Sequence, residues 1–223
     1  MKIAVLTGAG VSAESGIKTF RDSDGLWEGH DVMEVASPEG FARNPKAVLE
    51  FYNQRRRQLL AVQPNAAHKA LAGLEKMHEV TIITQNVDDL HERAGSTNVI
   101  HLHGELLKAR CSVNENLVLD WKQDLNLGDL SDGNHQLRPH IVWFGEMVPM
   151  IEVAAEVVEK ADVIIIVGTS MQVYPAAGLV QYSKPSSTIY FIDPNPSISE
   201  TKRIKVFSEK ASTGVPKVVE LLK

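Results

Sequence analysis

The chain has 223 residues, 43% of them hydrophobic, and can therefore bury the core of one elaborated domain or of two small ones. Its formal net charge of −5, with no basic block longer than Arg55-Arg56-Arg57, argues against nucleic acid as the main partner. No apolar run approaches the roughly eighteen residues that a membrane span requires, and the first apolar run is not preceded by a signal peptide, so we expect no membrane partner and a cytoplasmic protein.

Five short apolar runs predict buried strands, and each is followed at once by polar residues or glycine. In an open parallel sheet, ligands bind outside the carboxyl ends of the strands, so the five following segments should meet at one site. The runs, each with its following segment, are 2–6 with 7–10, 80–83 with 84–88, 99–100 with 101–104, 163–167 with 168–170, and 188–192 with 193–195.

The segment after the first run has the pattern Gly8-x-Gly10-x-x-Ala13, between a predicted strand and a segment able to start a helix. This is the context of a dinucleotide-binding fingerprint. The first glycine permits a tight turn, the second lets the backbone approach a pyrophosphate, and the small third residue lets helix and strand pack closely. A glycine turn in some other α/β protein is the alternative, because one such match is not specific.

Residues 20–35 predict a polar loop with Phe20, Leu26 and Trp27 as apolar anchors, not a second strand. A dehydrogenase would have a strand here, ending about twenty residues after the fingerprint in an acidic residue that binds the ribose hydroxyls. The next predicted strand begins only near Val80. We therefore expect a loop that covers a cofactor rather than a site for hydride transfer.

Apolar residues at helical spacing predict helices within 38–62, 65–77, 151–160, 176–182 and 215–222. Residues 105–140 are rich in Asn, Asp and Gly around a short apolar stretch at 117–119, which predicts a small irregular module. The alternation of strands and helices predicts an α/β fold with a doubly wound parallel sheet. The remaining segments predict a small lobe formed by two insertions.

Five motifs follow one another along the chain. They are Gly8-Ala9-Gly10-Val11-Ser12-Ala13-Glu14-Ser15-Gly16-Ile17 with Thr19-Phe20-Arg21, then Thr84-Gln85-Asn86-Val87-Asp88, His103-Gly104, Val142-Trp143-Phe144-Gly145-Glu146 and Gly168-Thr169-Ser170. Over residues 2–211 the chain resembles the sirtuins, which are NAD-dependent protein-lysine deacylases. The resemblance implies a Rossmann-type sheet and one sirtuin-type domain over 1–223. Its large part would comprise about 1–27, 66–104 and 141–223, and its small lobe about 28–65 and 105–140.

The small lobe departs from the family pattern in its cysteines. Most sirtuins have two Cys-x-x-Cys pairs that bind zinc, whereas Cys111, the single cysteine of this chain, is followed by Ser112-Val113-Asn114. One thiolate excludes a disulfide framework and cannot form a structural zinc site, and His135 and His140 would add only an irregular three-ligand set. We expect no zinc and no other metal, and a lobe held together by apolar packing.

The resemblance implies NAD as a consumed co-substrate, with transfer of the acyl group to ADP-ribose and release of nicotinamide. By the resemblance His103 is the general base, a task that suits an imidazole, and His101 is its rival. Asn86 and Asp88 would be catalytic residues that hold the nicotinamide ribose and carboxamide, unless they serve only as turn residues. The other implied cofactor-binding residues are Gly8, Ala9, Gly10, Ser12, Ala13, Phe20, Arg21, Trp27, Gln85, Val87, Gly168, Thr169, Ser170, Asp193, Pro194, Asn195 and Ala211.

Tyr52 and Arg55 lie three residues apart in a predicted helix, which places them on one face. Sirtuins that remove acidic acyl groups look similar here, with Tyr and Arg at the base of the acyl pocket. An arginine can bind a succinyl or malonyl carboxylate bidentately, and a phenol adds a hydrogen bond. Taken alone, Arg55 in a run of three arginines would be a solvated helix face. The resemblance favours the acyl pocket.

The acylated peptide is expected to add as a strand between the loop near 172–174 and the segment Val142–Gly145, with Val142, Phe144 and Gly145 as its contacts, although Trp143 and Phe144 could equally serve in packing. Two other functions compete with a deacylase that acts on acylated lysine side chains of proteins. An ADP-ribosyltransferase on the same fold would not need Tyr52 and Arg55, and a non-catalytic NAD-sensing module would not need His103. We expect a deacylase for acetyl, succinyl and malonyl groups that acts as a monomer.

Overall fold

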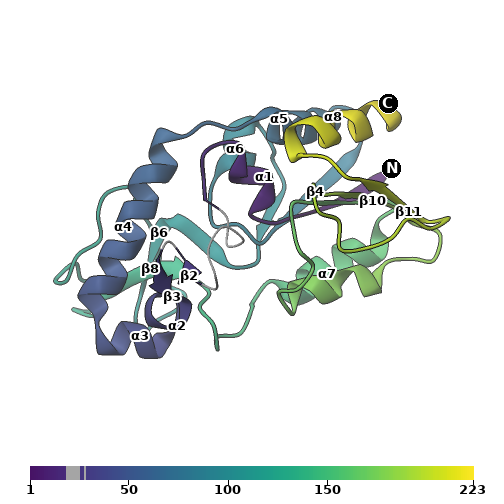
Figure 1. Ribbon diagram of the computed structural model, residues 1–223. Coiled ribbons are helices and arrows are strands. Elements are labelled where there is room, and N and C mark those ends of the chain that lie inside the picture. Colours follow the sequence, from purple (N-terminus) through teal and green to yellow (C-terminus); the bar gives the residue numbers. More distant parts are fainter. Residues whose placement is uncertain (19–25, 28) are drawn as a thin grey trace.

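The computed structural model describes residues 1–18, 26, 27 and 29–223, with the backbone alone for residues 26 and 27. Within this part of the chain, six parallel strands form the main sheet in the order β11-β10-β9-β1-β4-β5 (Figure 1). Their bounds are Lys2–Thr7 for β1, Glu79–Thr84 for β4, Val99–His101 for β5, Val163–Val167 for β9, Thr188–Ile192 for β10 and Ile204–Phe207 for β11. The predicted parallel sheet is confirmed. Strand β11, a short strand at the sheet edge, was not predicted.

Helices cover both faces of the main sheet. Ile3 and Val5 of β1 pack on one face with α5 and α8, whereas Ala4 and Leu6 pack on the other with α7 and η2. The bounds of these helices are Ala66–Leu74 for α5, Ala211–Leu221 for α8, Ile151–Lys160 for α7 and Ala176–Tyr182 for the 3-10 helix η2. Because both faces are buried, the strands are continuous apolar runs. The doubly wound arrangement is therefore confirmed, and α5 and α8 lie on the opposite side of the sheet from α7 (Figure 1).

Helix α8 begins four residues before the predicted start at 215. The backbone nitrogen and the hydroxyl of Ser212 both donate to the carboxylate of Glu14, at 2.9 and 2.8 Å. This contact between distant segments secures a first helical turn that carries little apolar periodicity of its own.

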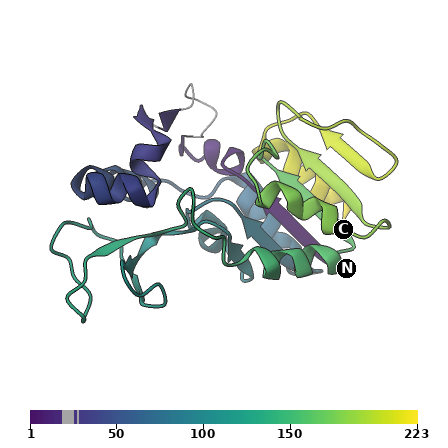
Figure 2. The same ribbon diagram turned by 90° about the horizontal axis from the view of Figure 1, so that it is seen from below.

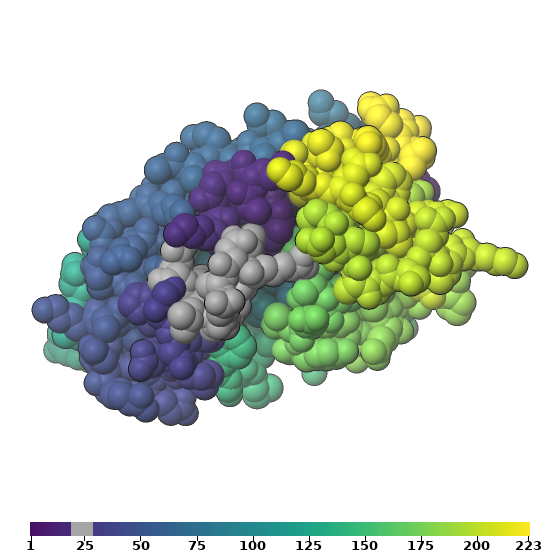
Figure 3. Space-filling view, viewed as in Figure 1, coloured from purple at the N-terminus to yellow at the C-terminus, as the bar shows by residue number. Residues whose placement is uncertain are grey.

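The second part of the molecule combines three helices with a three-stranded antiparallel sheet of order β7-β6-β8, which lies beside α4 (Figure 2). Its elements are α2 (Val32–Val35), α3 (Pro38–Arg43), α4 (Pro45–Ala61), β6 (Gly104–Cys111), β7 (Val118–Asp120) and β8 (Leu137–Ile141). We refer to these elements as the small lobe. In the space-filling view, α2–α4 in dark blue and the C-terminal segments in yellow occupy opposite ends of the face (Figure 3).

The prediction of an irregular module over 105–140 holds for 112–117 and 121–136, which contain no helix or strand element, but it missed the strands β6, β7 and β8. Strands β6 and β8 form a ladder, but Arg110 and Arg138 are buried in it, and the register shifts between Glu105 and Ala109. Buried charges and a register shift both hide the period of two by which a strand is recognised. The segment 20–35, predicted as a loop, also contains two antiparallel strands of two residues each, β2 (Leu26–Trp27) and β3 (His30–Asp31), which pair with each other.

A buried asparagine ties α4 to the loop between β7 and β8. The side-chain amide of Asn53 donates to the carbonyl of Leu125 at 3.0 Å, and its oxygen accepts from the Leu125 nitrogen at 2.8 Å. Arg56, which is fully buried, donates to the same Asn53 oxygen at 2.7 Å and to the carbonyl of Leu106 at 3.1 Å. Burial lowers the pKa of Arg56 to about 10, so it keeps its charge at pH 7. Polar contacts therefore supplement the predicted apolar packing of this lobe.

Gln136 fastens the loop that precedes β8. Its amide oxygen accepts from the nitrogen of Gly128 at 2.9 Å, and its amide nitrogen lies 3.0 Å from the carbonyl of Asn126 and 3.2 Å from that of Asp129. Nearby, the buried Cys111 sulfur lies 3.5 Å from the Ser131 hydroxyl. Among the residues that the structure describes, no group of three or more His, Cys, Asp or Glu side chains is placed to hold a metal. Of the helices described there, none is long and apolar enough to cross a membrane.

Chelators are expected to leave the thermal stability of the protein unchanged, because metal binding adds to folding free energy only where a metal site exists. Differential scanning fluorimetry with and without a strong chelator measures this, and a protein with two zinc-binding cysteine pairs serves as the positive control. Stoichiometric zinc in elemental analysis of the purified protein would contradict the prediction and would implicate Cys111 with His135 or His140.

Candidate active site

The segments that follow the main-sheet strands meet at the carboxyl edge of the sheet, as predicted. Backbone hydrogen bonds join each segment to a neighbouring strand, and for the segment after β10 the bond runs from Asp193 to Phe207 of β11 at 3.2 Å. The bonds of the other four segments run from Gly8 to Val167 and from Gly168 to Ile192, both at 3.0 Å, and from Gln85 to Thr7 and from Leu102 to Thr84, both at 2.9 Å. The strand order reverses between β1 and β9, and in this type of sheet the ligand crevice lies at such a reversal.

At this reversal the glycine turn after β1 packs against the glycine that follows β9. A Cβ added to Gly10 would lie 2.7 Å from the Cα of Gly168, and one added to Gly8 would lie 2.8 Å from the Cβ of Thr169. Gly168 itself has a φ of +61°, a conformation that side chains disfavour. Glycine is therefore required at these positions by the neighbouring backbone, before any ligand is considered.

The short helix α1 (Gly10–Ala13) starts in this turn, with Ala9 at its N-cap. The predicted packing role of Ala13 is wrong, because Ala13 is exposed and cannot bring helix and strand together. Val11 is the fully buried apolar residue of α1 and makes that contact instead.

Three predicted residues come together in a buried hydrogen-bond network beside α1. The hydroxyl of Ser12 donates to the Asp88 carboxylate at 2.9 Å and accepts from the side-chain amide of Asn86 at 3.1 Å. The other Asp88 oxygen accepts from the nitrogen of Leu90, where α6 (Leu90–Ala94) begins. The segments after β1 and β4 thus present one continuous set of donors and acceptors.

His68 joins this network and was missed by the sequence analysis. Its Nδ1 accepts from the nitrogen of Asn65 at 3.3 Å, so the neutral ring carries its proton on Nε2, which lies 3.4 Å from the Ser12 hydroxyl. Burial lowers the pKa of His68 to about 4 and keeps the ring neutral. The available signal was a histidine on the apolar face of a helix, three residues after an N-cap asparagine.

His103 has one ring nitrogen bound to the backbone. Its Nδ1 lies 2.9 Å from the carbonyl of Gln85, and because a carbonyl can only accept, the proton of the neutral ring resides on Nδ1. Burial lowers the pKa of His103, although the Gln85 carbonyl opposes this, so the ring is neutral at pH 7. Its Nε2 is then a basic nitrogen suited to accept a proton.

His101 is engaged at both ring nitrogens. Its Nε2 lies 2.7 Å from the Glu92 carboxylate, and its Nδ1 lies 3.3 Å from the carbonyl of Asn86. Burial acts to lower the pKa of His101, but the hydrogen bond and charge of Glu92 outweigh it and the pKa is raised. This arrangement holds the Asn86 segment in place and suits His101 less well than His103 to the role of base.

The other predicted cofactor residues lie around the same edge. The Thr169 hydroxyl accepts from the Gln85 side chain at 3.1 Å, and the Val87 carbonyl accepts from Leu106 of β6 at 2.8 Å. The buried Asp193 carboxylate accepts from the nitrogen of Asn195 at 2.9 Å, which is a turn contact. Ser170 is half-buried, Pro194 and Asn195 are exposed, and Ala211 is buried at the start of α8. Phe20 and Arg21 lie outside the described residues, and Trp27 is described by its backbone in β2.

Tyr52 and Arg55 lie together on α4. Tyr52 is fully buried, and its hydroxyl oxygen accepts the indole N–H of Trp143 at 2.9 Å. Arg55 is half-buried, donates to the carbonyl of Phe51 at 2.6 Å, and places its guanidinium carbon 3.4 Å from the centroid of the Phe51 ring. Burial raises the pKa of Tyr52 so that the phenol stays neutral. Arg55 is therefore partly withdrawn from water and is not a fully solvated helix residue.

Two arginines share one carboxylate next to Trp143. Glu146 accepts from Arg110 at 3.0 Å, from Arg138 at 2.6 Å and from the backbone nitrogen of Trp143 at 2.8 Å. The guanidinium carbon of Arg138 also lies 3.4 Å from the centroid of the Trp143 ring. This cluster has an excess of one positive charge. Arg110 and Arg138 were not predicted as site residues, because Glu146 lies 36 residues from Arg110 and, at eight residues from Arg138, lies beyond the end of β8.

The segment after β8 links the two parts of the molecule. Val142 donates its backbone N–H to the carbonyl of His103, and Phe144 donates to the carbonyl of Ala36, both at 2.9 Å. The Phe144 side chain is 47% exposed, and Gly145 has a φ of +90°. An exposed aromatic beside a glycine turn leaves this segment accessible to a partner chain.

Residues 8–175 match a family model described as the Sir2 family. The chain belongs to the Sir2 family. It is 57% identical to an NAD-dependent protein deacylase of Helicobacter pylori, over 98% of each chain. A solved complex of a mutant Sir2 homologue with ADP-ribose has a TM-score of 0.87 and 42% identity, covering 98% of this chain and 90% of that one. A Sir2 homologue in complex with NAD has a TM-score of 0.85 and 42% identity, covering 99% and 88%. The predicted resemblance to sirtuins is thereby confirmed.

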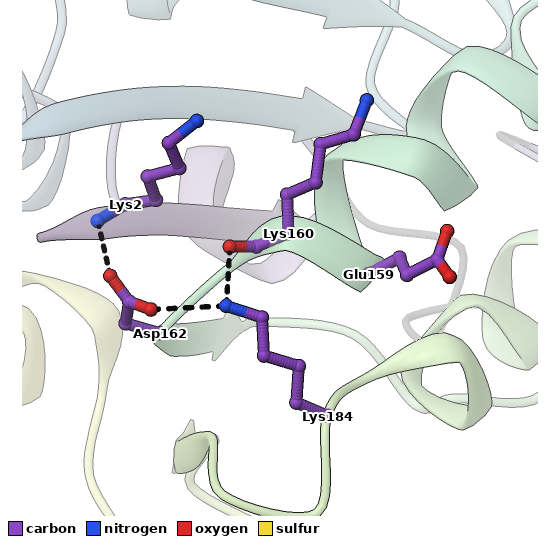
Figure 4. Close-up of a pocket in the computed structure, with 5 residues that line it drawn as sticks. All are labelled: Lys2, Glu159, Lys160, Asp162 and Lys184. Atoms are coloured by element: carbon purple, nitrogen blue, oxygen red, sulfur yellow. Dashed lines mark hydrogen bonds and ion pairs between the residues drawn. The ribbon is translucent and has the colours of Figure 1, made fainter.

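One cavity of this sirtuin lies away from the candidate site. It measures about 560 Å³ and lies where β1 and β9 begin, at the opposite edge of the sheet (Figure 4). Asp162 in its lining is already engaged, because it accepts from the backbone nitrogen of Lys2 at 2.9 Å and from the Lys184 amine at 3.1 Å. A smaller cavity of about 180 Å³ adjoins the site and is lined in part by Asp88 and His101.

Replacing Asp88 with asparagine is expected to change how stability depends on pH. Burial raises the pKa of Asp88 from 3.8 to about 6, although the Ser12 hydrogen bond opposes this. In the unfolded chain the carboxyl group loses its proton at lower pH than in the native state. The wild type should therefore lose stability relative to the variant as pH rises from about 4 to about 6, with a constant difference above that range.

Urea unfolding of both proteins across this range measures the difference. Asp120→Asn, at an exposed position of β7, is the control. A difference between wild type and Asp88→Asn that does not vary with pH would contradict the prediction.

Proposed function

We propose that this sirtuin is an NAD-dependent protein-lysine deacylase that removes succinyl and malonyl groups as well as acetyl groups. The acyl group passes to ADP-ribose, and nicotinamide is released. The choice of acyl group rests on one observation, which is the positive surroundings of the buried Tyr52 hydroxyl. The positive charges of Arg138 and Arg55 act on it against the negative charge of Glu146, and Glu146 is a carboxylate that Arg138 shares with Arg110.

An acyl chain that ends in a carboxylate would compensate this excess of positive charge. A carboxylate held by a guanidinium and a phenol gains charge-assisted hydrogen bonds, which are stronger than those between neutral groups. An acetyl group ends in a methyl and gains nothing from these partners. Tyr52 and Arg55 would therefore select acidic acyl groups without being needed for the reaction itself.

The segments at the β1–β9 reversal fit NAD by their donor set. The glycine turn presents backbone to the ligand where no side chain competes, and Ser12, Asn86 and Asp88 present hydroxyl, amide and carboxylate groups. When bound, NAD supplies the bond between ribose and nicotinamide that the reaction breaks. Asn86 and Asp88 would hold the nicotinamide ribose and carboxamide, and the segments after β9 and β10 would hold the adenosine half.

His103 would act as the general base. Its Nε2 would accept a proton through the ribose hydroxyls, while the Gln85 carbonyl holds Nδ1 and fixes the ring. The peptide that carries the acylated lysine would add as a strand at Val142, Phe144 and Gly145. Pairing through the backbone gives affinity with little sequence selectivity, which suits many protein substrates. We also propose a cytoplasmic monomer without nucleic-acid or membrane partners; the net charge of −5 supports the part of this proposal that concerns nucleic acid.

The test uses one peptide with succinyl-, malonyl-, acetyl- or unmodified lysine at the same position, with nicotinamide release and product masses as readouts. Nicotinamide release should require an acylated lysine, and the acyl group should appear on ADP-ribose. Release without acylated peptide, with ADP-ribose added to protein, would identify an ADP-ribosyltransferase. NAD binding without release would identify a sensing module. If the enzyme turns over acetyl-lysine but neither succinyl- nor malonyl-lysine, the proposed activity on acidic acyl groups is wrong.

A further inference from the structure

We propose that Trp143 is a positioning residue that orients the Tyr52 hydroxyl and thereby sets the preference for acidic acyl groups. This inference rests on the proposed function. The contact joins α4 to the segment after β8, across 91 residues of sequence, through the indole N–H and the phenol oxygen at 2.9 Å. Tyr52 is fully buried and Trp143 is 2% exposed, so water does not compete for either group.

The direction of this hydrogen bond follows from the chemistry of the two groups. An indole N–H can only donate, so the Tyr52 oxygen must accept, and the phenol proton points elsewhere. Because the phenol stays neutral, Tyr52 keeps that proton as a hydrogen-bond donor. A carboxylate can only accept, so it is the matching partner for a phenol whose acceptor side is already occupied. Trp143 therefore makes Tyr52 a donor toward the acyl group.

Trp143 is held rigidly enough to impose this direction. The Arg138 guanidinium stacks on its ring at 3.4 Å, and the ring of Phe41 lies 5.3 Å away on a centroid-to-centroid measure. The backbone nitrogen of Trp143 donates to Glu146 at 2.8 Å, and Glu146 is in turn held by Arg110 and Arg138. The charged cluster thus fixes both the ring and the backbone of the residue that orients Tyr52.

The experiment compares kcat/KM for succinyl-lysine and acetyl-lysine on one peptide. Trp143→Phe keeps an aromatic ring but removes the N–H, and is expected to lower the succinyl value about tenfold and leave the acetyl value within about threefold. Trp121→Phe is the matched control, because Trp121 follows β7 as Trp143 follows β8 and also donates its indole N–H, to the carbonyl of Asp124 at 3.2 Å. The control should leave the ratio of the two substrates unchanged.

A double-mutant cycle separates positioning from general support of the lobe. If Trp143 acts through the Tyr52 hydroxyl, adding Trp143→Phe to Tyr52→Phe should not change the succinyl-to-acetyl ratio any further. Independent effects of the two changes on the ratio, or equal losses on both substrates in Trp143→Phe, would overturn the proposal. Arg55→Met serves as the reference for the proposed function. If Arg55→Met lowers kcat/KM equally for both substrates, the proposed preference for acidic acyl groups is wrong. If Arg55→Met lowers only the succinyl value and Trp143→Phe lowers neither value, only the role of Trp143 is wrong.

A second measurement leaves Trp143 unchanged and does not depend on the folding of its variants. The chain has three tryptophans, so the indole N–H resonance of Trp143 can be assigned by NMR from single substitutions of the other two. This resonance should shift in Tyr52→Phe, and on addition of succinyl peptide more than of acetyl peptide. An unchanged resonance in Tyr52→Phe would overturn the proposal.

Discussion

Replacing His103 with alanine is expected to lower the rate of deacylation by roughly 10²–10⁴-fold or more and to leave NAD binding largely intact. The loss follows from removal of the basic Nε2, since the Gln85 carbonyl engages the other ring nitrogen. NAD binding should persist because Ser12, Asn86 and Asp88 bind one another without His103. Steady-state deacylation at saturating NAD and calorimetric titration of NAD measure the two quantities.

Two other histidines provide the comparison. His78→Ala removes a ring that contacts the carbonyl of Leu222 at the end of the chain, and should leave turnover near normal. His101→Ala removes the contacts with Glu92 and the Asn86 carbonyl. It should lower the rate of deacylation less than His103→Ala does. Near-normal turnover in His103→Ala, with a large loss in His101→Ala, would transfer the role of base to His101.

The sequence was sufficient to predict the main sheet because its strands are buried on both faces and are continuous apolar runs. Residues 163–167, for example, form an all-buried strand and were predicted with the observed bounds. The convergence of the following segments could be predicted for the same reason, since parallel strands place their carboxyl ends at one edge. Strand β11 was missed because it is four residues long, includes Lys205 and lies at the sheet edge, where burial is incomplete.

The small lobe and the partners of the site residues were harder to predict, because long-range contacts determine them. Arg110 and Arg138 appear as surface charges in the sequence, and the ion pairs with Glu146 that offset their burial depend on the folded loop after β8. The hydrogen bond from Trp143 to Tyr52 has no local signal either. Ala13 shows the opposite error, since a motif assigned it a packing role that its exposure excludes.

Replacing Arg55 with methionine is expected to lower kcat/KM for succinyl- or malonyl-lysine. The loss of transition-state stabilisation should be roughly 2–4 kcal/mol, the scale seen when one member of a buried charge pair is removed. Arg55 is half-buried against the Phe51 ring, so a carboxylate bound there would lose much of its water and depend on the guanidinium. Acetyl-lysine has no carboxylate, and its turnover should stay within about threefold or improve. Tyr52→Phe should act in the same direction with a smaller effect, because it removes one hydrogen bond from a neutral donor.

Arg57→Met is the matched control for the loss of a charge on α4. Arg57 lies two residues further along the helix, binds Glu50 at 2.7 Å and Asp124 at 3.4 Å, and has a side chain that is 54% exposed. Removing it changes the helix charge by the same amount, yet it should leave the succinyl-to-acetyl ratio unchanged, because solvent screens an exposed charge. Parallel steady-state kinetics on one peptide, with thermal unfolding of each variant, provide the measurement. Equal losses on the two substrates in Arg55→Met would mean that Arg55 supports the small lobe and does not contact the acyl group.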